Sequence, residues 1–229
     1  MAHGGGTAAR RPAAAGIPWS RLVRPGLLYW IGMVPAVWTF WLGLTDQLGP
    51  DPMKVLERSL GLWALRFLVV GLTITPLRRL FNINLLRYRR AIGLLAFFYA
   101  VLHLTTYTVL DQGLDWAAIW KDIVKRPYIT IGMVAFLVLV PLAATSNKAA
   151  IRRLGGPAWV RLHKWVYLAA AAAAVHFVLV VKAWPPEPLV YAALVTVLLG
   201  YRIVMRLRRP QARTGRPLGT GRRPQARPV

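Results

Sequence analysis

Six long runs of apolar residues, separated by short polar connections, dominate the pattern along the chain. Each run is close to the roughly 17 to 25 residues that a helix needs to cross a hydrocarbon layer ~30 Å thick. The runs extend over 27–45, 60–76, 91–110, 129–145, 165–184 and 189–205. Because lipid offers no hydrogen-bond partners, the backbone amides must be satisfied within each segment, which helices achieve and open strands do not. The pattern therefore predicts an all-α integral membrane protein with six transmembrane helices.

Charge gives these predicted helices a direction. Although 56% of the residues are hydrophobic and the mean hydropathy is +0.45, the chain carries a formal charge of +23. All seven acidic residues lie in or beside the connections that follow the first, third and fifth runs. Most of the Lys and Arg residues lie at the other ends of the runs, and positive charge marks the cytoplasmic side of a membrane protein. We therefore expect both termini to be cytoplasmic.

Two basic tails flank the predicted membrane domain, which extends over residues 25–207. Residues 1–24 are rich in Gly, Ala, Pro and Arg, and residues 208–229 are rich in Arg, Pro and Gly. Such compositions predict disorder, and the C-terminal charge predicts attraction to anionic lipid headgroups. A nucleic-acid partner is not expected, because the arginines flank membrane spans and form no basic face on a soluble fold. The absence of cysteine excludes disulfides, iron–sulfur clusters and thiolate zinc sites.

The connection after the third run contains a further helical pattern, in the stretch DWAAIWKDIVKRP. Charged residues alternate there with apolar residues at helical spacing. The apolar residues are Trp116, Ile119, Trp120, Ile123 and Val124. This pattern predicts a short helix that lies in the outer interface of the membrane. It favours simple anchoring by tryptophan over a landing surface for an external partner.

Two histidines within the apolar runs are the candidate functional residues. His103 lies in AVLHLTTY and His176 in AAAVHFVLV, where an imidazole is costly to bury. A buried neutral histidine can also be purely structural, bonding a neighbouring carbonyl and nothing else. The depth of the two histidines in the membrane helps to decide between a structural and a functional role. Both helices begin on the cytoplasmic side, and a rise of ~1.5 Å per residue places each histidine roughly 18 to 20 Å toward the outer side. Two imidazoles at matching depth are the arrangement that axial ligation of a haem iron requires.

The surroundings of the two histidines agree with a flat cofactor. The six alanines at 169–174 leave room for a ring system, although such runs also serve close helix packing. Arg66 lies about 9 to 10 Å along the second helix from its outer end. No carboxylate is expected deep enough in the spans to pair with Arg66, so its expected partner is a haem propionate or the outer surface.

His163, in WVRLHKWVY, lies at the cytoplasmic end of the fifth run, and its role stays open. The position on the third helix that would oppose it holds Arg89, which is no iron ligand. On one continuous helix, the 13 residues from His163 to His176 would leave about 140° between their faces. His163 is therefore a candidate ligand of a second haem, a contact to a quinone or flavin, or an interfacial residue without a cofactor. His3 lies in the N-terminal tail and carries no signal.

Three segments of the chain resemble the ferric reductase-like transmembrane family, which includes the membrane parts of NADPH oxidases. They are LWALRFLVVGLTITPLRRL (62–80), RRAIGLLAFFYAVLHLTTY (89–107) and RLHKWVYLAAAAAAVHF (161–177). The resemblance covers about residues 17–207 and is closest to the haem-binding membrane subunit of a periplasmic methionine-sulfoxide reductase system. It implies that the family's haem histidines fall on His103, His163 and His176, with b-type haem in one copy or two.

The resemblance also implies a direction of electron flow. Quinol in the bacterial inner membrane would reduce the haem, and the electrons would leave outward to a soluble molybdopterin reductase that repairs oxidised methionines in periplasmic proteins. The chain would then be an electron-transfer subunit and not the catalytic one. The flavin mononucleotide (FMN) that the family implies matches no motif in this sequence.

The chain departs from the oxidase branch of the family at its C-terminal end. The 24 residues after Met205 are too few for a domain that binds flavin and NADPH, and no G-x-G-x-x-G fingerprint occurs. The electrons must therefore come from another molecule. Two alternatives share the electron-carrier fold, namely a ferric reductase and a cytochrome b subunit of a different oxidoreductase.

Two further alternatives belong to other functional classes. A proton-coupled transporter without haem is disfavoured, because no carboxylate is expected deep in the spans and no matched pair of broken segments marks a substrate site. A non-catalytic assembly factor is the other alternative.

Overall fold

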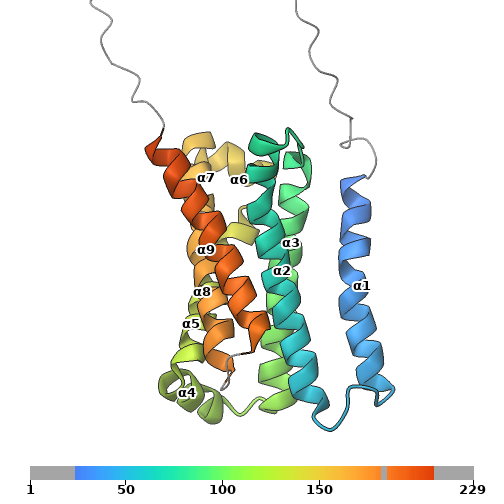
Figure 1. Ribbon diagram of the computed structural model, residues 1–229. Coiled ribbons are helices and arrows are strands. Elements are labelled where there is room, and N and C mark those ends of the chain that lie inside the picture. Colours follow the sequence, from blue (N-terminus) through green and yellow to red (C-terminus); the bar gives the residue numbers. More distant parts are fainter. Residues whose placement is uncertain (1–23, 182–184, 209–229) are drawn as a thin grey trace, which may run out of the picture.

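The computed structural model describes residues 24–181 and 185–208, and the regular structure in these ranges is helical (Figure 1). Six helical stretches are long and apolar enough to cross a membrane, which confirms the predicted all-α fold with six spans. The elements are α1 (Pro25–Leu44), α2 (Pro52–Leu80), the 3-10 turn η2 (Leu86–Tyr88), α3 (Arg89–Thr105), the π-helical segment η3 (Thr106–Asp111), α4 (Trp116–Lys125), α5 (Pro127–Ala144), α6 (Lys148–Leu154), α7 (Gly156–His163), α8 (Val166–Val180) and α9 (Pro186–Leu207).

Two predicted spans differ from the observed helices. α2 begins at Pro52, about two turns before its predicted start, and therefore includes Glu57 and Arg58. The observed fifth span, Gly156–Val180, begins before the predicted run 165–184 and consists of α7 and α8, which are separated by a short turn. His163 is the last residue of α7, so the face angle expected for one continuous helix does not apply to it.

The short helices α6 and α7 were not predicted, although local signals for them are present. Asn147 caps α6, because its side chain accepts a hydrogen bond from the amide of Ala150 at 2.8 Å. Gly155 follows α6 with a φ of 74°, a left-handed conformation that glycine adopts without strain and that redirects the chain into α7. Trp159 then ties α7 to the end of α5 by donating to the carbonyl of Thr145 at 2.9 Å.

The predicted basic tails lie outside the described residues, apart from Arg24 and Arg208, and His3 lies outside them as well. The last residues of the predicted fifth run, 182–184, are also outside the described part of the chain.

The long helices run side by side in one bundle, with α6 and α7 at one end and α4 across the other (Figure 1). α2 packs against α3, α5 packs against α8, and α9 contacts both α8 and α2. The seven acidic residues lie toward the α4 end, in α4 and at its N-cap, in the α1–α2 connection and in the adjoining ends of α2, η3 and α9. The observed bundle thus carries the charge asymmetry on which the predicted orientation depends.

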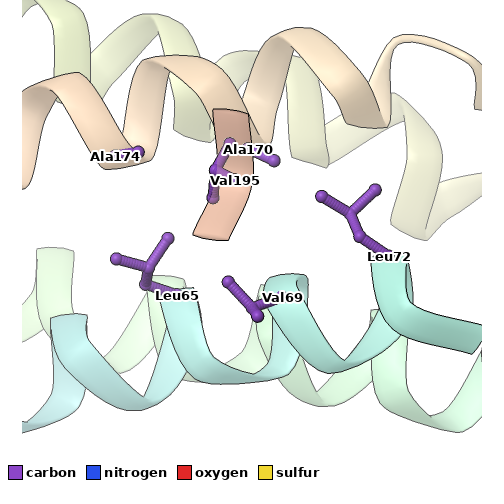
Figure 2. Packing of buried hydrophobic residues seen from close by; sticks show 6 residues of the cluster. All are labelled: Leu65, Val69, Leu72, Ala170, Ala174 and Val195. Atoms are coloured by element: carbon purple, nitrogen blue, oxygen red, sulfur yellow. The ribbon is translucent and has the colours of Figure 1, made fainter. Parts of the chain in front are cut away.

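Small side chains let the central helices approach one another. One buried cluster joins α2, α8 and α9, and Figure 2 shows its members, Leu65, Val69, Leu72, Ala170, Ala174 and Val195. Ala169 belongs to a second cluster with residues of α2, α3 and α5. The alanine run of α8 therefore serves close helix packing, which is one of the two roles considered for it.

Large apolar side chains cover the outside of the bundle. Trp30 and Val37 on α1 are 75% and 64% exposed, and Val197 on α9 is 68% exposed. A water-soluble protein buries such side chains, whereas a membrane span presents them to lipid. The exposed surface therefore agrees with the membrane assignment that the sequence predicts.

Three of the described helices contain an internal proline, and at two of these, Pro35 and Pro76, side chains from other helices bond nearby backbone groups. Pro35 interrupts α1, and there the hydroxyl of Tyr99 donates to the carbonyl of Gly32 at 2.7 Å and accepts from the amide of Ala36 at 2.9 Å. Tyr99 thus takes the place of a direct bond between two residues that are four apart in the helix.

Pro76 has the same effect in α2, since its missing N–H leaves the carbonyl of Leu72 without its usual partner. Arg202 of α9 supplies that partner by donating to the Leu72 oxygen at 2.8 Å. A second nitrogen of the same guanidinium donates to the Tyr167 hydroxyl at 3.0 Å. Arg202 therefore connects α9 with both α2 and α8.

We predict that Tyr99→Phe destabilises the protein by about 1–3 kcal/mol, because removing the hydroxyl leaves two buried backbone groups unsatisfied. Tyr99 is fully buried, so water cannot replace the lost bonds. Unfolding in detergent micelles, followed by circular dichroism, measures the change, with Tyr29→Phe on α1 as the control. An unfolding midpoint unchanged from that of the parent protein would contradict this role of Tyr99.

Candidate functional site

His103 on α3 and His176 on α8 lie next to each other inside the bundle. Their ring centroids are 6.2 Å apart, and the ring planes are inclined by 73°. Both residues are half-buried. The predicted convergence of two imidazoles from separate helices is therefore present in the structure.

The separation of the rings suits two ligands on one metal atom. In metalloproteins, an imidazole nitrogen lies about 2.0–2.1 Å from a first-row metal such as zinc. Two such bonds in line, with roughly 1 Å from each nitrogen to its ring centre, place the two centres ~6 Å apart. The observed 6.2 Å agrees with this value.

One nitrogen of each ring is already engaged by a backbone carbonyl of a neighbouring helix. Nδ1 of His103 lies 2.9 Å from the carbonyl oxygen of Glu57 on α2. Nδ1 of His176 lies 2.7 Å from the carbonyl oxygen of Tyr128 on α5. Because a carbonyl can only accept, each Nδ1 carries the proton, and each neutral ring keeps an unprotonated Nε2. Nε2 is therefore the nitrogen available to a metal, in the arrangement that metal-binding histidines usually show.

Two glycines lie directly against these rings and were missed by the sequence analysis. A Cβ atom on Gly61 of α2 would be 3.0 Å from Nδ1 of His103. A Cβ atom on Gly132 of α5 would be 2.8 Å from Nδ1 of His176. The only signal for them in the sequence is that each glycine interrupts an apolar helix, where glycine is unfavourable.

The donor set of this site fits a haem better than a bare metal ion. In residues 24–181 and 185–208, no group of three His, Asp or Glu side chains is placed to hold a metal. A bare first-row metal needs about four protein or water ligands, whereas a porphyrin supplies four nitrogens of its own. Two imidazoles with free Nε2 atoms would then suffice to complete the ligand set of a haem iron.

Arg66 has a carboxylate partner that the sequence analysis did not foresee. Its Nη2 lies 3.7 Å from Oε1 of Glu187, in the first turn of α9, and its Nε donates to the Tyr191 hydroxyl at 2.9 Å. Arg58 reaches the other carboxylate oxygen of Glu187, also at 3.7 Å. The expectation that no span provides a carboxylate for Arg66 is therefore wrong, because α9 begins early enough to include Glu187.

His163 lies on α7, apart from the other two histidines. Its ring stacks on Trp159 with 3.8 Å between centroids, and its Nδ1 lies 3.1 Å from the Trp159 carbonyl. Its Nε2 lies 3.4 Å from the hydroxyl of Ser146, which follows α5. The structure thus brings together only His103 and His176, and it surrounds His163 with different groups.

A π-helical segment connects α3 to the α4 end of the bundle. η3 begins three residues after His103, and the hydroxyl of Tyr107 in it donates to Asp122 of α4 at 3.2 Å. α4 is the predicted interfacial helix, and Trp116 and Trp120 are both 69% exposed on it. π-Helical turns occur frequently at functional sites.

Comparison with known proteins relates the whole arrangement to one group. A family model for the ferric reductase like transmembrane component matches residues 60–183, a range that includes all three candidate histidines. Relatives from Brucella ovis, Brucella abortus and Brucella melitensis each bear the name protein-methionine-sulfoxide reductase heme-binding subunit MsrQ. Each is 58% identical over 210 residues, which are 90% of this chain and 93% of the relative.

Proposed function

The chain belongs to the ferric reductase-like transmembrane family and, within it, to the MsrQ heme-binding subunits, and on this premise we propose its electron donor, cofactor and acceptor. It is a multi-pass membrane protein with an electron-transfer role in a methionine-sulfoxide reductase system. We propose that it carries electrons from quinol in the bacterial inner membrane, through b-type haem, to a periplasmic molybdopterin reductase. The observation that carries the proposal is the pair of imidazoles 6.2 Å apart, each with a free Nε2.

Haem, when bound, supplies a one-electron carrier whose potential depends on its axial ligands and its burial. His103 and His176 would hold the haem iron through their Nε2 atoms. The carbonyls of Glu57 and Tyr128 orient the two rings and increase the basicity of Nε2. Arg66 would neutralise a propionate, since its ion pair with Glu187 is long and partly exposed and therefore weak.

The position of the histidine pair favours delivery at the α4 end. Glu57 and Tyr128, which bond the two imidazoles, lie near the starts of α2 and α5, and both helices begin at that end. The positive-inside rule assigns this acidic end to the periplasm and both chain termini to the cytoplasm. Electrons on the haem would then lie close to the face where a periplasmic acceptor docks.

The opposite half of the bundle offers a place for the quinol. A groove of about 330 Å³ opens between α5 and the α7–α8 region, and it is lined by Val134, Leu137, Val138, Pro141, Leu142, Leu162 and Trp165. Its lining is apolar, as an isoprenoid tail requires. Leu162 precedes His163, and the Leu142 carbonyl accepts from Ser146 at 2.7 Å, so the groove borders the His163–Ser146 pair.

The proposed transfer balances one quinol against one sulfoxide. Oxidation of a quinol to the quinone releases two electrons and two protons. Reduction of one methionine sulfoxide to methionine and water consumes two electrons and two protons. In this chain, His163 and Ser146 would accept the hydrogen bonds of the quinol hydroxyls at the inner end of the groove. Nε2 of His163 would take up the two protons one after the other and release each to the cytoplasmic solvent.

We predict that the purified protein gives the reduced-minus-oxidised spectrum of a low-spin b-type haem. His103→Ala and His176→Ala should each abolish the low-spin signal, because each removes one of two axial ligands. His163→Ala is the matched control, and it should retain the signal of the haem between the other two histidines. A low-spin spectrum that survives both His103→Ala and His176→Ala would show that other residues bind the iron.

We predict that Leu137→Trp slows reduction of the haem by a short-chain quinol at least several-fold, because the indole fills the groove. Reduction by dithionite, which does not use the groove, should keep its rate. Val197→Trp on the exposed face of α9 controls for a new tryptophan at the lipid boundary. Equal quinol rates in both variants would place the donor site elsewhere.

We predict that Arg66→Gln lowers the midpoint potential of the haem by on the order of 50 mV, since loss of a nearby positive charge disfavours the reduced state. Glu187→Gln should have the opposite effect, because it removes the negative charge that partly cancels Arg66. Potentiometric titration of the two variants measures both shifts. An unchanged potential in Arg66→Gln would mean that Arg66 serves only its contacts with α9.

A further inference from the structure

The two histidines are held by two copies of one local arrangement. The ring of His103 lies against Gly61, and its Nδ1 donates to the carbonyl of Glu57, four residues before that glycine on α2. The ring of His176 lies against Gly132, and its Nδ1 donates to the carbonyl of Tyr128, again four residues before the glycine on α5. The same offset therefore recurs on two helices whose sequences around it, ERSLG and YITIG, share only the glycine.

The glycine is what allows each ring to reach its carbonyl. Residues four apart lie on one face of a helix, so a side chain at the glycine position would stand over the carbonyl that the imidazole bonds. A Cβ atom would lie 3.0 Å from Nδ1 and 3.1 Å from Cε1 of His103, and 2.8 Å and 3.0 Å from the same atoms of His176. Any larger residue must push the imidazole away from the carbonyl oxygen.

We propose that Gly61 and Gly132 are positioning residues for the haem ligands. Because each glycine has no side chain, the neighbouring imidazole can reach a helix carbonyl, which fixes the tautomer and orientation of the ring. This inference rests on the proposed haem function. Glycine within a helix is less favourable than alanine, and the orientation of a metal ligand offsets that cost. The tighter contacts at Gly132 make it the more sensitive of the two positions.

The test compares Gly61→Ala and Gly132→Ala with two control variants. In Gly71→Ala, on the same helix as Gly61, the new methyl group would lie 3.6 Å from Ile92, an ordinary contact. In Gly93→Ala on α3, nothing lies within 4 Å of the new atom. Each variant is purified without haem, titrated with haem, and examined by absorption and electron paramagnetic resonance spectroscopy, with and without added imidazole.

Gly132→Ala should weaken haem binding by about 10- to 100-fold, as does the loss of groups that orient a metal ligand, and should convert low-spin iron to high-spin iron. Added imidazole should restore the low-spin spectrum, because it replaces a displaced ligand in a site that is otherwise intact. Gly61→Ala should show the same changes to a smaller extent. Both control variants should match the parent protein.

Two results would overturn the inference. One is parental haem affinity and a parental low-spin spectrum in both Gly61→Ala and Gly132→Ala. The other is loss of haem that imidazole does not restore, in all four alanine variants alike, which would indicate a general effect on the bundle. If Gly132→Ala does not accumulate in membranes, Gly61→Ala decides between these results. A parent protein that binds no haem would instead overturn the proposed function.

Discussion

Lipid offers no hydrogen-bond partner, and this one constraint accounts for most of the polar contacts inside the bundle. Where Pro35 and Pro76 interrupt the helical ladders, Tyr99 and Arg202 from other helices bond the groups concerned. The two imidazoles obey the same rule, because each gives its N–H to a carbonyl of an adjacent helix. At these four side chains, the backbone of another helix supplies the hydrogen-bond partner that lipid does not offer.

The same contacts prepare the site for its cofactor. A histidine that merely fills the core of a protein also bonds a carbonyl, so this contact alone does not separate a ligand from a structural residue. The closeness of the two rings distinguishes ligands from structural histidines, since the ring centroids lie 6.2 Å apart and each ring retains one free nitrogen. Bonds that satisfy the interior therefore also fix which nitrogen of each imidazole is free.

The sequence predicted the parts of this architecture that depend on the pattern of hydrophobic residues and on the rise per residue of a helix. Hydrophobic runs fixed the number of spans, and counting residues along two helices placed His103 and His176 at one level. Gly61 and Gly132 were missed because their role exists only where α2 meets α3 and α5 meets α8. The carboxylate beside Arg66 was missed for a related reason, since Glu187 lies 121 residues later in the chain, at the start of another helix.

The bond between Arg202 and the Leu72 carbonyl has an evolutionary consequence. Arg202 compensates for a proline that lies on a different helix and far away in the chain, so a change at residue 76 alters what residue 202 has to supply. In a homologue with another residue in place of Pro76, the α2 amide itself would bond that carbonyl, and an apolar residue would become acceptable in place of Arg202. Residues 76 and 202 should therefore change together during descent, although neither lies beside the histidine pair.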